Sequence, residues 1–189
     1  MKAIQVFCGS SSGQDPVYAE AAKELGQVFV DQNIDLVYGA GNVGLMGIIA
    51  NTMLDQGANV IGVIPEFLMQ KEVGHRGITE LIIVDGMHTR KVEMYKRAQG
   101  TIVLPGGFGT LDELFEMLTL AQLEQHPYPI GLLNIRGYFD HLLAQLDHMV
   151  QEKFLKDFHR NLLLSAPDPI TLLEQMRVFE PLGDKGKWW

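Results

Sequence analysis

The sequence has few of the features that mark secreted, membrane-spanning or nucleic-acid-binding proteins. It contains a single cysteine, Cys8, so it cannot form an internal disulfide, which is typical of a reducing compartment. Its apolar runs are all shorter than the roughly 18 residues of a membrane-spanning helix, and its N-terminus lacks the pattern of a signal peptide. With 15 basic and 23 acidic residues it carries a net charge of −8, which argues against a nucleic-acid or anionic-membrane partner. We therefore expect a cytoplasmic protein that binds neither nucleic acid nor membrane.

Motifs for metals and cofactors are also missing from the sequence. None of the six histidines pairs with another in an H-x-H or H-x-x-x-H pattern, so we expect no metal site. No lysine stands in an obvious Schiff-base context, so we expect no pyridoxal-dependent decarboxylase activity. The chemistry is then expected to use no cofactor and to rest on the side chains and backbone of the chain itself.

The sequence does have a regular alternation of short apolar runs with longer helical patterns. In a chain of 189 residues, 47% of them hydrophobic, this alternation predicts one α/β domain, a doubly wound parallel sheet with helices on both faces. The continuously apolar runs at 60–64 and 81–84 are typical of strands buried on both sides. We expect strands at 4–8, 34–38, 59–64, 80–84, 101–104 and 130–134, and helices at 16–32, 45–56, 87–98, 110–125, 138–152 and 169–179.

The domain is expected to span residues 1–182, followed by a tail at 183–189. That tail is either loose, or its two tryptophans pack on a partner. On the predicted helix at 110–125, the stripe expected to face the core consists of Leu111, Leu114, Phe115, Leu118, Ala121 and Leu123.

Three of the predicted strands end in glycine-rich turns, at residues 8–13, 39–47 and 105–110. Ligands of open α/β sheets bind beyond the carboxyl ends of the strands. Glycine lets backbone N–H groups approach an anion, and a helix N-terminus adds a favourable dipole. A phosphorylated ligand is therefore the first expectation, with Gly9, Ser10 and Gly41 as candidate contacts and with Met46 and Met87 as a candidate apolar pocket for a base.

Simpler interpretations of the first two turns remain open. The serines of the first turn, with Asp15, also suit the start of a helix. The second turn fits a loose G-x-G-x-x-G pattern, but it equally suits a tight connection between strand and helix. No acidic residue ends the next strand, where Ile64 is followed by Pro65, and this disfavours a dinucleotide-dependent oxidoreductase.

The third turn and the helix at 87–98 carry the more particular signals. Thr110 and Glu113 have the spacing of a capping box, so they could serve as a helix cap, a ligand site or both. Arg90 and Lys91 place two cations in the first turn of a helix, where the helix dipole disfavours them. Cations at a helix N-terminus without a visible structural gain indicate a functional role. We expect Arg90 to reach a phosphate or Glu113. The alternative is a solvated pair on an exposed face.

Three segments in order along the chain resemble a known family. They are LPGGFGTLDE at 104–113, MHTRK at 87–91, and the glycine turn at 39–47 that ends in GLMG. Together they resemble the Lonely Guy family of cytokinin-activating phosphoribohydrolases, whose members were often labelled lysine decarboxylases. The resemblance implies a Rossmann-like homodimer. It also implies hydrolysis of the N-glycosidic bond of an adenosine 5′-monophosphate, especially an N6-prenylated one, to the free base and ribose 5-phosphate.

The resemblance also implies roles for individual residues. Arg90 and Glu113 become the catalytic pair, and a carboxylate there suits the positive charge that develops on the ribose as the C–N bond breaks. Asp112 stands where many relatives have glutamate, a mild departure. The further substrate contacts implied are Glu72, Lys91, Gly106, Gly107, Phe108, Gly109, Thr110 and Thr119.

A second class of function stays open beside the hydrolase. The same superfamily fold is used by carriers that hold a nucleotide-like cofactor without cleaving it. The presence of both Arg90 and Glu113 favours the enzyme, because a carrier has no need of that pair. The sequence does not say whether the substrate is plain AMP or a prenylated nucleotide.

Overall fold

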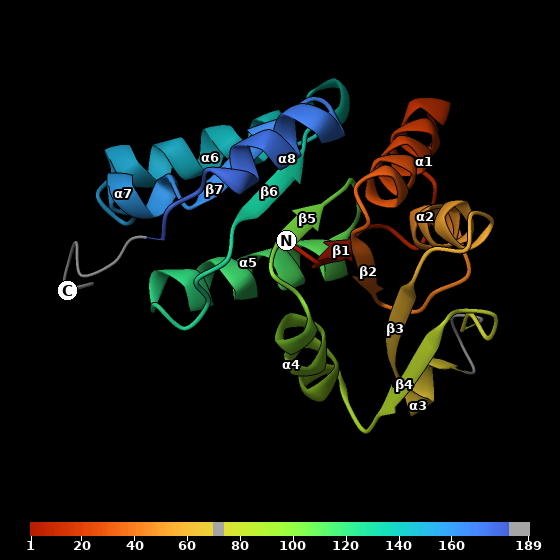
Figure 1. The fold of residues 1–189 in the computed structure, drawn as a ribbon. Coiled ribbons are helices and arrows are strands. Elements are labelled where there is room, and N and C mark those ends of the chain that lie inside the picture. Colours follow the sequence, from red (N-terminus) through yellow and green to blue (C-terminus); the bar gives the residue numbers. More distant parts are fainter. Residues whose placement is uncertain (70–73, 182–189) are drawn as a thin grey trace.

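The computed structural model describes residues 1–69 and 74–181, and these build one seven-stranded sheet in which every neighbouring pair is parallel (Figure 1). The strand order is β4-β3-β2-β1-β5-β6-β7, so the direction of winding reverses between β1 and β5. The strands are β1 (Ala3–Phe7), β2 (Asp35–Tyr38), β3 (Val60–Pro65), β4 (Glu80–Val84), β5 (Thr101–Val103), β6 (Ile130–Leu133) and β7 (Leu163–Ala166).

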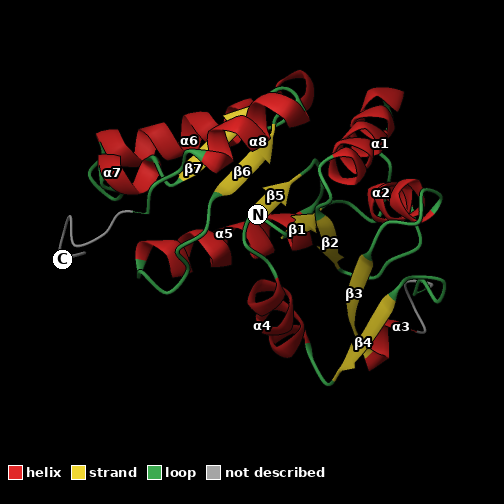
Figure 2. Ribbon diagram, viewed as in Figure 1, coloured by secondary structure: helices red, strands yellow, loops and turns green. Residues whose placement is uncertain are grey.

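Helices cover both faces of this sheet (Figure 2), as the strand–helix alternation predicts. One face packs against α1 (Pro16–Asp31), α2 (Gly44–Leu54) and α8 (Pro169–Arg177). The other packs against α4 (Met87–Arg97), α5 (Phe108–Gln122) and α6 (Asp140–Gln151). Three short elements complete the described part of the chain, α3 (Glu66–Met69), α7 (Asp157–Arg160) and the 3-10 turn η1 (Ile135–Gly137). The Rossmann-like α/β prediction is confirmed. No helix among the described residues is long and apolar enough to cross a membrane.

The predicted elements are all present, and the sequence patterns missed β7, α3, α7 and η1. The helical elements among these are at most four residues long, which is too short to show a helical period. The strand β7 (LLSA) is as short as β2 and β6, but the sequence pattern there did not predict a strand. The expectation that the run at 81–84 is buried on both sides is wrong. Because β4 lies at the edge of the sheet, Ile83 stays 56% exposed, whereas every residue of β3 is buried. The predicted tail at 183–189 lies outside the described residues.

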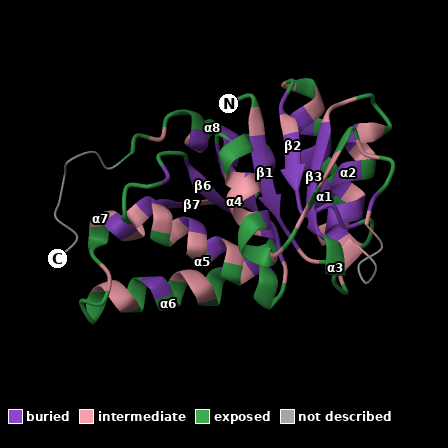
Figure 3. Ribbon diagram, turned by 90° about the horizontal axis from the view of Figure 1, so that it is seen from below, coloured by how far each residue is buried: buried purple, intermediate pink, exposed green. Residues whose placement is uncertain are grey.

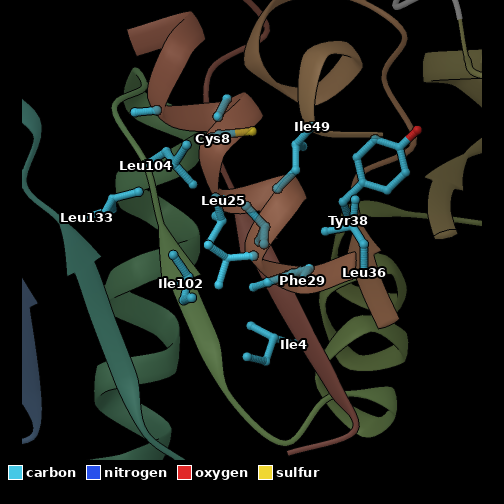
Figure 4. Close-up of a cluster of buried hydrophobic side chains, with 14 of the residues drawn as sticks. Ile4, Cys8, Leu25, Phe29, Leu36, Tyr38, Ile49, Ile102, Leu104 and Leu133 are labelled. Carbon is cyan, nitrogen blue, oxygen red and sulfur yellow. The ribbon is translucent and has the colours of Figure 1, made fainter. Parts of the chain in front are cut away.

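The central strands are buried on both faces, and exposed residues gather on the outer sides of the helices (Figure 3). On the side of α1 and α2, Leu25 and Phe29 meet Ile4 and Leu36 of the sheet in one apolar cluster (Figure 4). Phe29 has no exposed surface. Burying such a side chain stabilises the fold by about 1.5–3 kcal/mol, so this cluster holds α1 against β1 and β2.

Replacing Phe29 with alanine should lower the free energy of unfolding by about 3–5 kcal/mol, because the cavity left behind cannot collapse in a close-packed core. Urea denaturation followed by circular dichroism measures the change. Phe154→Ala is the matched control, since Phe154 is 88% exposed and its loss should change stability by less than about 0.5 kcal/mol. Equal effects of the two substitutions would contradict this description of the core.

Candidate active site

A cavity of about 270 Å³ opens at the carboxyl ends of β1 and β5, where the winding of the sheet reverses. Ligands of doubly wound sheets bind at this position. The cavity is bordered by the loops that follow β1 and β5 and by the first turns of α4 and α5. It brings together most of the residues predicted from the sequence: Gly9, Ser10, Met46, Met87, Arg90, Gly107, Phe108, Gly109, Thr110 and Glu113.

Arg90 enters this cavity from the first turn of α4 and is only 5% exposed. Its Nε donates a hydrogen bond to the carbonyl oxygen of Val63 at 3.0 Å, and its Nη2 donates one to that of Gly39 at 2.7 Å. Nη1 approaches the sulfur of Met87 at 3.9 Å. The guanidinium is therefore fixed by backbone at the ends of two strands, and the interpretation of Arg90 as a solvated surface charge is wrong.

The glycines of the second turn, at residues 39–47, leave space for the Arg90 and Met46 side chains. A Cβ at Gly39 would lie 1.9 Å from Arg90 Nη2, and one at Gly41 would lie 2.6 Å from the terminal carbon of Met46. Gly44 has a φ of +60° and packs against the backbone of Ser10. These glycines serve close packing, which agrees with the interpretation of the segment as a tight strand-to-helix turn. Gly41 itself does not line the cavity.

All three glycine turns are joined at Gly9. Its N–H donates to the carbonyl oxygen of Pro105 at 3.0 Å, and its own carbonyl oxygen accepts from the N–H of Leu45 at 3.1 Å. Gly106 lies so close that a Cβ there would be 2.9 Å from the Gly9 nitrogen. The loop after β1 thus connects the loops after β2 and β5.

Helix α5 begins two residues before the predicted start, with Gly107 as its N-cap and without a hydrogen bond from a capping side chain. The prediction of a Thr110–Glu113 capping box is therefore wrong. Thr110 lies inside the first turn and is 4% exposed, with its hydroxyl packed against Gly106. The first N–H groups of a helix have no partner within the helix, and this turn holds no acidic residue to compete for them. Such N–H groups, together with the helix dipole, suit an anion.

The glycines of this third turn serve different purposes. A Cβ at Gly106 would lie 2.1 Å from the Thr110 hydroxyl, so the fold requires glycine there. At Gly107 and Gly109 a Cβ would meet nothing within 4 Å, and neither residue has a positive φ. The fold does not require glycine at these two positions, where the missing side chains keep the anion site open.

Glu113 lines the same cavity as Arg90. It lies on α5, about one helical turn after Thr110. Cys8, at the end of β1, also lines it. Burial raises the pKa of the Cys8 thiol far above its ordinary value, and the negative charge of Glu113 raises it further. The thiol therefore stays protonated at neutral pH and offers no nucleophilic thiolate.

Lys91 points away from the cavity that Arg90 enters. Its Nζ forms ion pairs with Asp112 at 3.0 Å and with Glu116, both on α5. Burial lowers the pKa of Lys91, but the hydrogen bonds and charges of Glu116 and Asp112 outweigh it, and the pKa is raised. Lys91 stays protonated and links the helix that carries Arg90 to the helix that carries Glu113.

Gly106 and Thr119 also do not line this cavity. Thr119 is exposed on α5, and its hydroxyl donates to the carbonyl oxygen of Phe115. Glu72 lies outside the described residues. Within those residues no group of three or more histidine, cysteine or acidic side chains is placed to hold a metal ion.

A second cavity of about 330 Å³ adjoins the first and shares Gly9, Ser10 and Gly107 with it. Its wall includes Tyr138, whose hydroxyl donates to the carbonyl oxygen of Gly106 at 2.7 Å. The sequence analysis missed this tyrosine because it stands 32 residues from Gly106, and no local pattern connects them.

The chain is similar to proteins of known family and described activity. A family described as "Possible lysine decarboxylase" matches residues 46–176. The cytokinin riboside 5′-monophosphate phosphoribohydrolase LOG7 of Arabidopsis thaliana is 47% identical over 97% of this chain and 85% of its own length. LOG1 of the same plant, with the same described activity, is 46% identical over 97% of this chain and 86% of its length. Among solved structures, the molybdenum cofactor carrier protein of Chlamydomonas reinhardtii has a TM-score of 0.66 at 15% identity, over 94% of this chain and 98% of that one.

The two adjacent glycines of the third turn should respond differently to alanine. Gly106→Ala should lower the free energy of unfolding by about 1–3 kcal/mol, because the new methyl group overlaps Thr110. Gly107→Ala should leave stability within about 1 kcal/mol but weaken the binding of inorganic phosphate. Urea denaturation in phosphate-free buffer and titration calorimetry measure the two effects. Equal destabilisation by both substitutions would be evidence against an open anion site.

Proposed function

Because the chain belongs to the family of cytokinin riboside 5′-monophosphate phosphoribohydrolases, we propose that Arg90 and Glu113 are its catalytic pair. The protein is an N-glycosyl hydrolase that releases the base from a nucleotide. The observation that carries the site assignment is the shared cavity, in which a carboxylate and a backbone-anchored guanidinium lie beside an uncapped helix N-terminus.

The proposed chemistry follows from these groups. As the bond between C1′ and the base nitrogen breaks, positive charge develops on the ribose, and the Glu113 carboxylate stabilises it. The same carboxylate accepts a proton from the attacking water, whose oxygen bonds to C1′ while the departing base gains a proton. Arg90 holds oxygens of the phosphoribosyl group in place, and its two carbonyl acceptors keep its own position fixed.

The remaining lining supports a 5′-phosphorylated substrate with a purine base. The phosphate would lie at the N-terminus of α5, beside Gly107 and Gly109. The base would lie against Met46, Met87 and Leu68, which give the cavity its apolar side. We propose that adenosine 5′-monophosphates are substrates, with or without an N6-prenyl group. The chemistry described needs no cofactor. A cytoplasmic location remains a proposal from composition alone.

The carrier alternative has a weaker basis. The likeness to a molybdenum cofactor binding protein at 21% identity and to a molybdenum cofactor carrier protein at 15% concerns the fold alone. A guanidinium and a carboxylate in one cavity favour bond cleavage over storage.

Glu113→Gln should lower kcat for base release by at least about 100-fold, because an amide neither stabilises the ribosyl cation nor accepts a proton. Purified protein is incubated with AMP and, separately, with isopentenyladenosine 5′-monophosphate, and free base is measured by chromatography. Glu20→Gln on the exposed side of α1 removes the same charge elsewhere and should leave kcat unchanged.

Near-normal turnover by the Glu113 variant would remove Glu113 from the mechanism. A wild-type protein that binds both nucleotides and cleaves neither would favour the carrier instead. The ratio of the two rates identifies the preferred substrate.

We also propose a homodimer that uses the outer side of α5. Phe115 and Leu123, predicted to face the core, are instead 38% and 39% exposed, because α5 buries Leu114, Met117 and Ala121. Thr119 lies on this outer side, where it lines an apolar cavity with Phe115, Leu118 and residues of α6. A partner chain across this surface would cover the apolar residues, and Thr119 could then contact the partner's substrate.

Phe115→Asp should convert the dimer to a monomer, because a charge at the centre of an apolar interface loses its hydration without gaining a partner. Sedimentation equilibrium measures the mass, and base release from AMP should fall with dissociation. Phe154→Asp introduces the same charge at an 88% exposed phenylalanine and should leave the mass unchanged. A wild-type protein that sediments as a stable monomer would contradict the dimer.

A further inference from the structure

The peptide between Gly106 and Gly107 is held from the side of the second cavity. The Gly106 carbonyl oxygen accepts a hydrogen bond of 2.7 Å from the Tyr138 hydroxyl. The preceding carbonyl, that of Pro105, accepts one of 3.0 Å from the Gly9 N–H. Both carbonyl oxygens that lead into the N-terminus of α5 are therefore engaged by donors outside the turn.

The direction of these carbonyls decides whether the turn can bind an anion. A trans peptide is planar, so its N–H points opposite to its C=O, and the described peptides are all trans. With the Gly106 oxygen directed at Tyr138, the Gly107 N–H must point away from Tyr138. In a flipped peptide the oxygen would take the place of that N–H and would repel a phosphate.

On the Gly107 side, the chain itself offers little resistance to such a flip. The residues on both sides of the peptide are glycines, which populate left- and right-handed backbone conformations about equally readily. A Cβ at Gly107 would meet nothing within 4 Å, so no neighbour restrains that side. The hydrogen bond from Tyr138 is therefore the one side-chain contact among the described residues that this carbonyl accepts and that fixes the direction of the peptide.

Tyr138 is itself held in place by aromatic contacts. Its ring meets Tyr18 of α1 edge-on, with centroids 5.8 Å apart, and Phe139 at 4.9 Å. Phe139 is 2% exposed and belongs to the core on the side of α5 and α6. The ring is 44% exposed, but its buried side contacts residues of both helical layers, and these contacts orient the hydroxyl.

We propose that Tyr138 is a positioning residue for the 5′-phosphate: its hydroxyl fixes the Gly106–Gly107 peptide so that the Gly107 N–H faces the phosphate. This inference rests on the proposed function, since it assigns the phosphate to the N-terminus of α5. Tyr138 does not contact the reacting bond, so it should affect the binding of the phosphoribosyl group and not the cleavage step.

Tyr138→Phe tests this, because it removes the hydroxyl and keeps the ring. Titration calorimetry measures binding of the two product fragments, ribose 5-phosphate and adenine. The dissociation constant of ribose 5-phosphate should rise about tenfold, the effect of one lost hydrogen bond, while that of adenine stays the same. KM for AMP should rise by a similar factor with kcat within about twofold, because the phosphate is bound equally before and during cleavage.

Tyr128→Phe is the matched control, since Tyr128 lies beyond the end of α5 and lines neither cavity. It should leave both dissociation constants unchanged. An unchanged affinity of Tyr138→Phe for ribose 5-phosphate would overturn the proposal. So would an equal loss for both fragments with a lower melting temperature, which would mark a merely structural role.

The binding measurement separates this inference from the proposed function. If the wild-type protein binds ribose 5-phosphate but cleaves no nucleotide, the hydrolase assignment fails and the comparison with Tyr138→Phe still decides the role of Tyr138. If the wild-type protein binds neither ribose 5-phosphate nor inorganic phosphate, the turn is not an anion site and the role proposed for Tyr138 is overturned, while base release still decides the catalytic pair.

Discussion

A buried guanidinium is the feature on which the rest of the site depends. A charged group inside a protein costs several kcal/mol unless it is paired or hydrogen-bonded, and Arg90 meets this cost with two carbonyl oxygens from the ends of β2 and β3. Each hydrogen bond to a charged group contributes about 1.5–3 kcal/mol. Because the acceptors are neutral carbonyls, they fix the guanidinium in the cavity without themselves neutralising its charge. The absence of a side chain at Gly39 is the local condition for this arrangement.

The two adjacent cations of α4 have different roles: one lies in the proposed catalytic site and the other stabilises the packing of two helices. Successive residues on a helix point about 100° apart, so Arg90 and Lys91 cannot face the same way. Arg90 lines the cavity, while Lys91 forms ion pairs with Asp112 and Glu116. The second cation thereby holds together the helices that supply the two proposed catalytic groups.

Much of this fold could be predicted from the sequence, because buried parallel strands appear as continuous apolar runs and glycine marks the turns between them. The gathering of Arg90, Gly107 and Glu113 could also be predicted, since strand ends and helix starts meet at one edge of a parallel sheet. Other features depend on information that local patterns lack. The T-x-x-E spacing could not reveal that Gly107, and not Thr110, precedes the first helical residue. The hydrogen bond from Tyr138 to Gly106 joins segments whose proximity only the folded chain determines.

The contacts of Gly9 have a consequence for engineering the substrate range. Because the turns after β2 and β5 both bind to this one residue, lengthening either turn would displace the other and the anion site with it. Met46 packs against two glycines of the turn after β2, and Met87 contacts Arg90, so both are tied to the same arrangement. Leu68 lines the cavity and makes none of these contacts. Of the three side chains proposed to hold the base, Leu68 is therefore the one through which base specificity could be varied with the least effect on the proposed phosphate site.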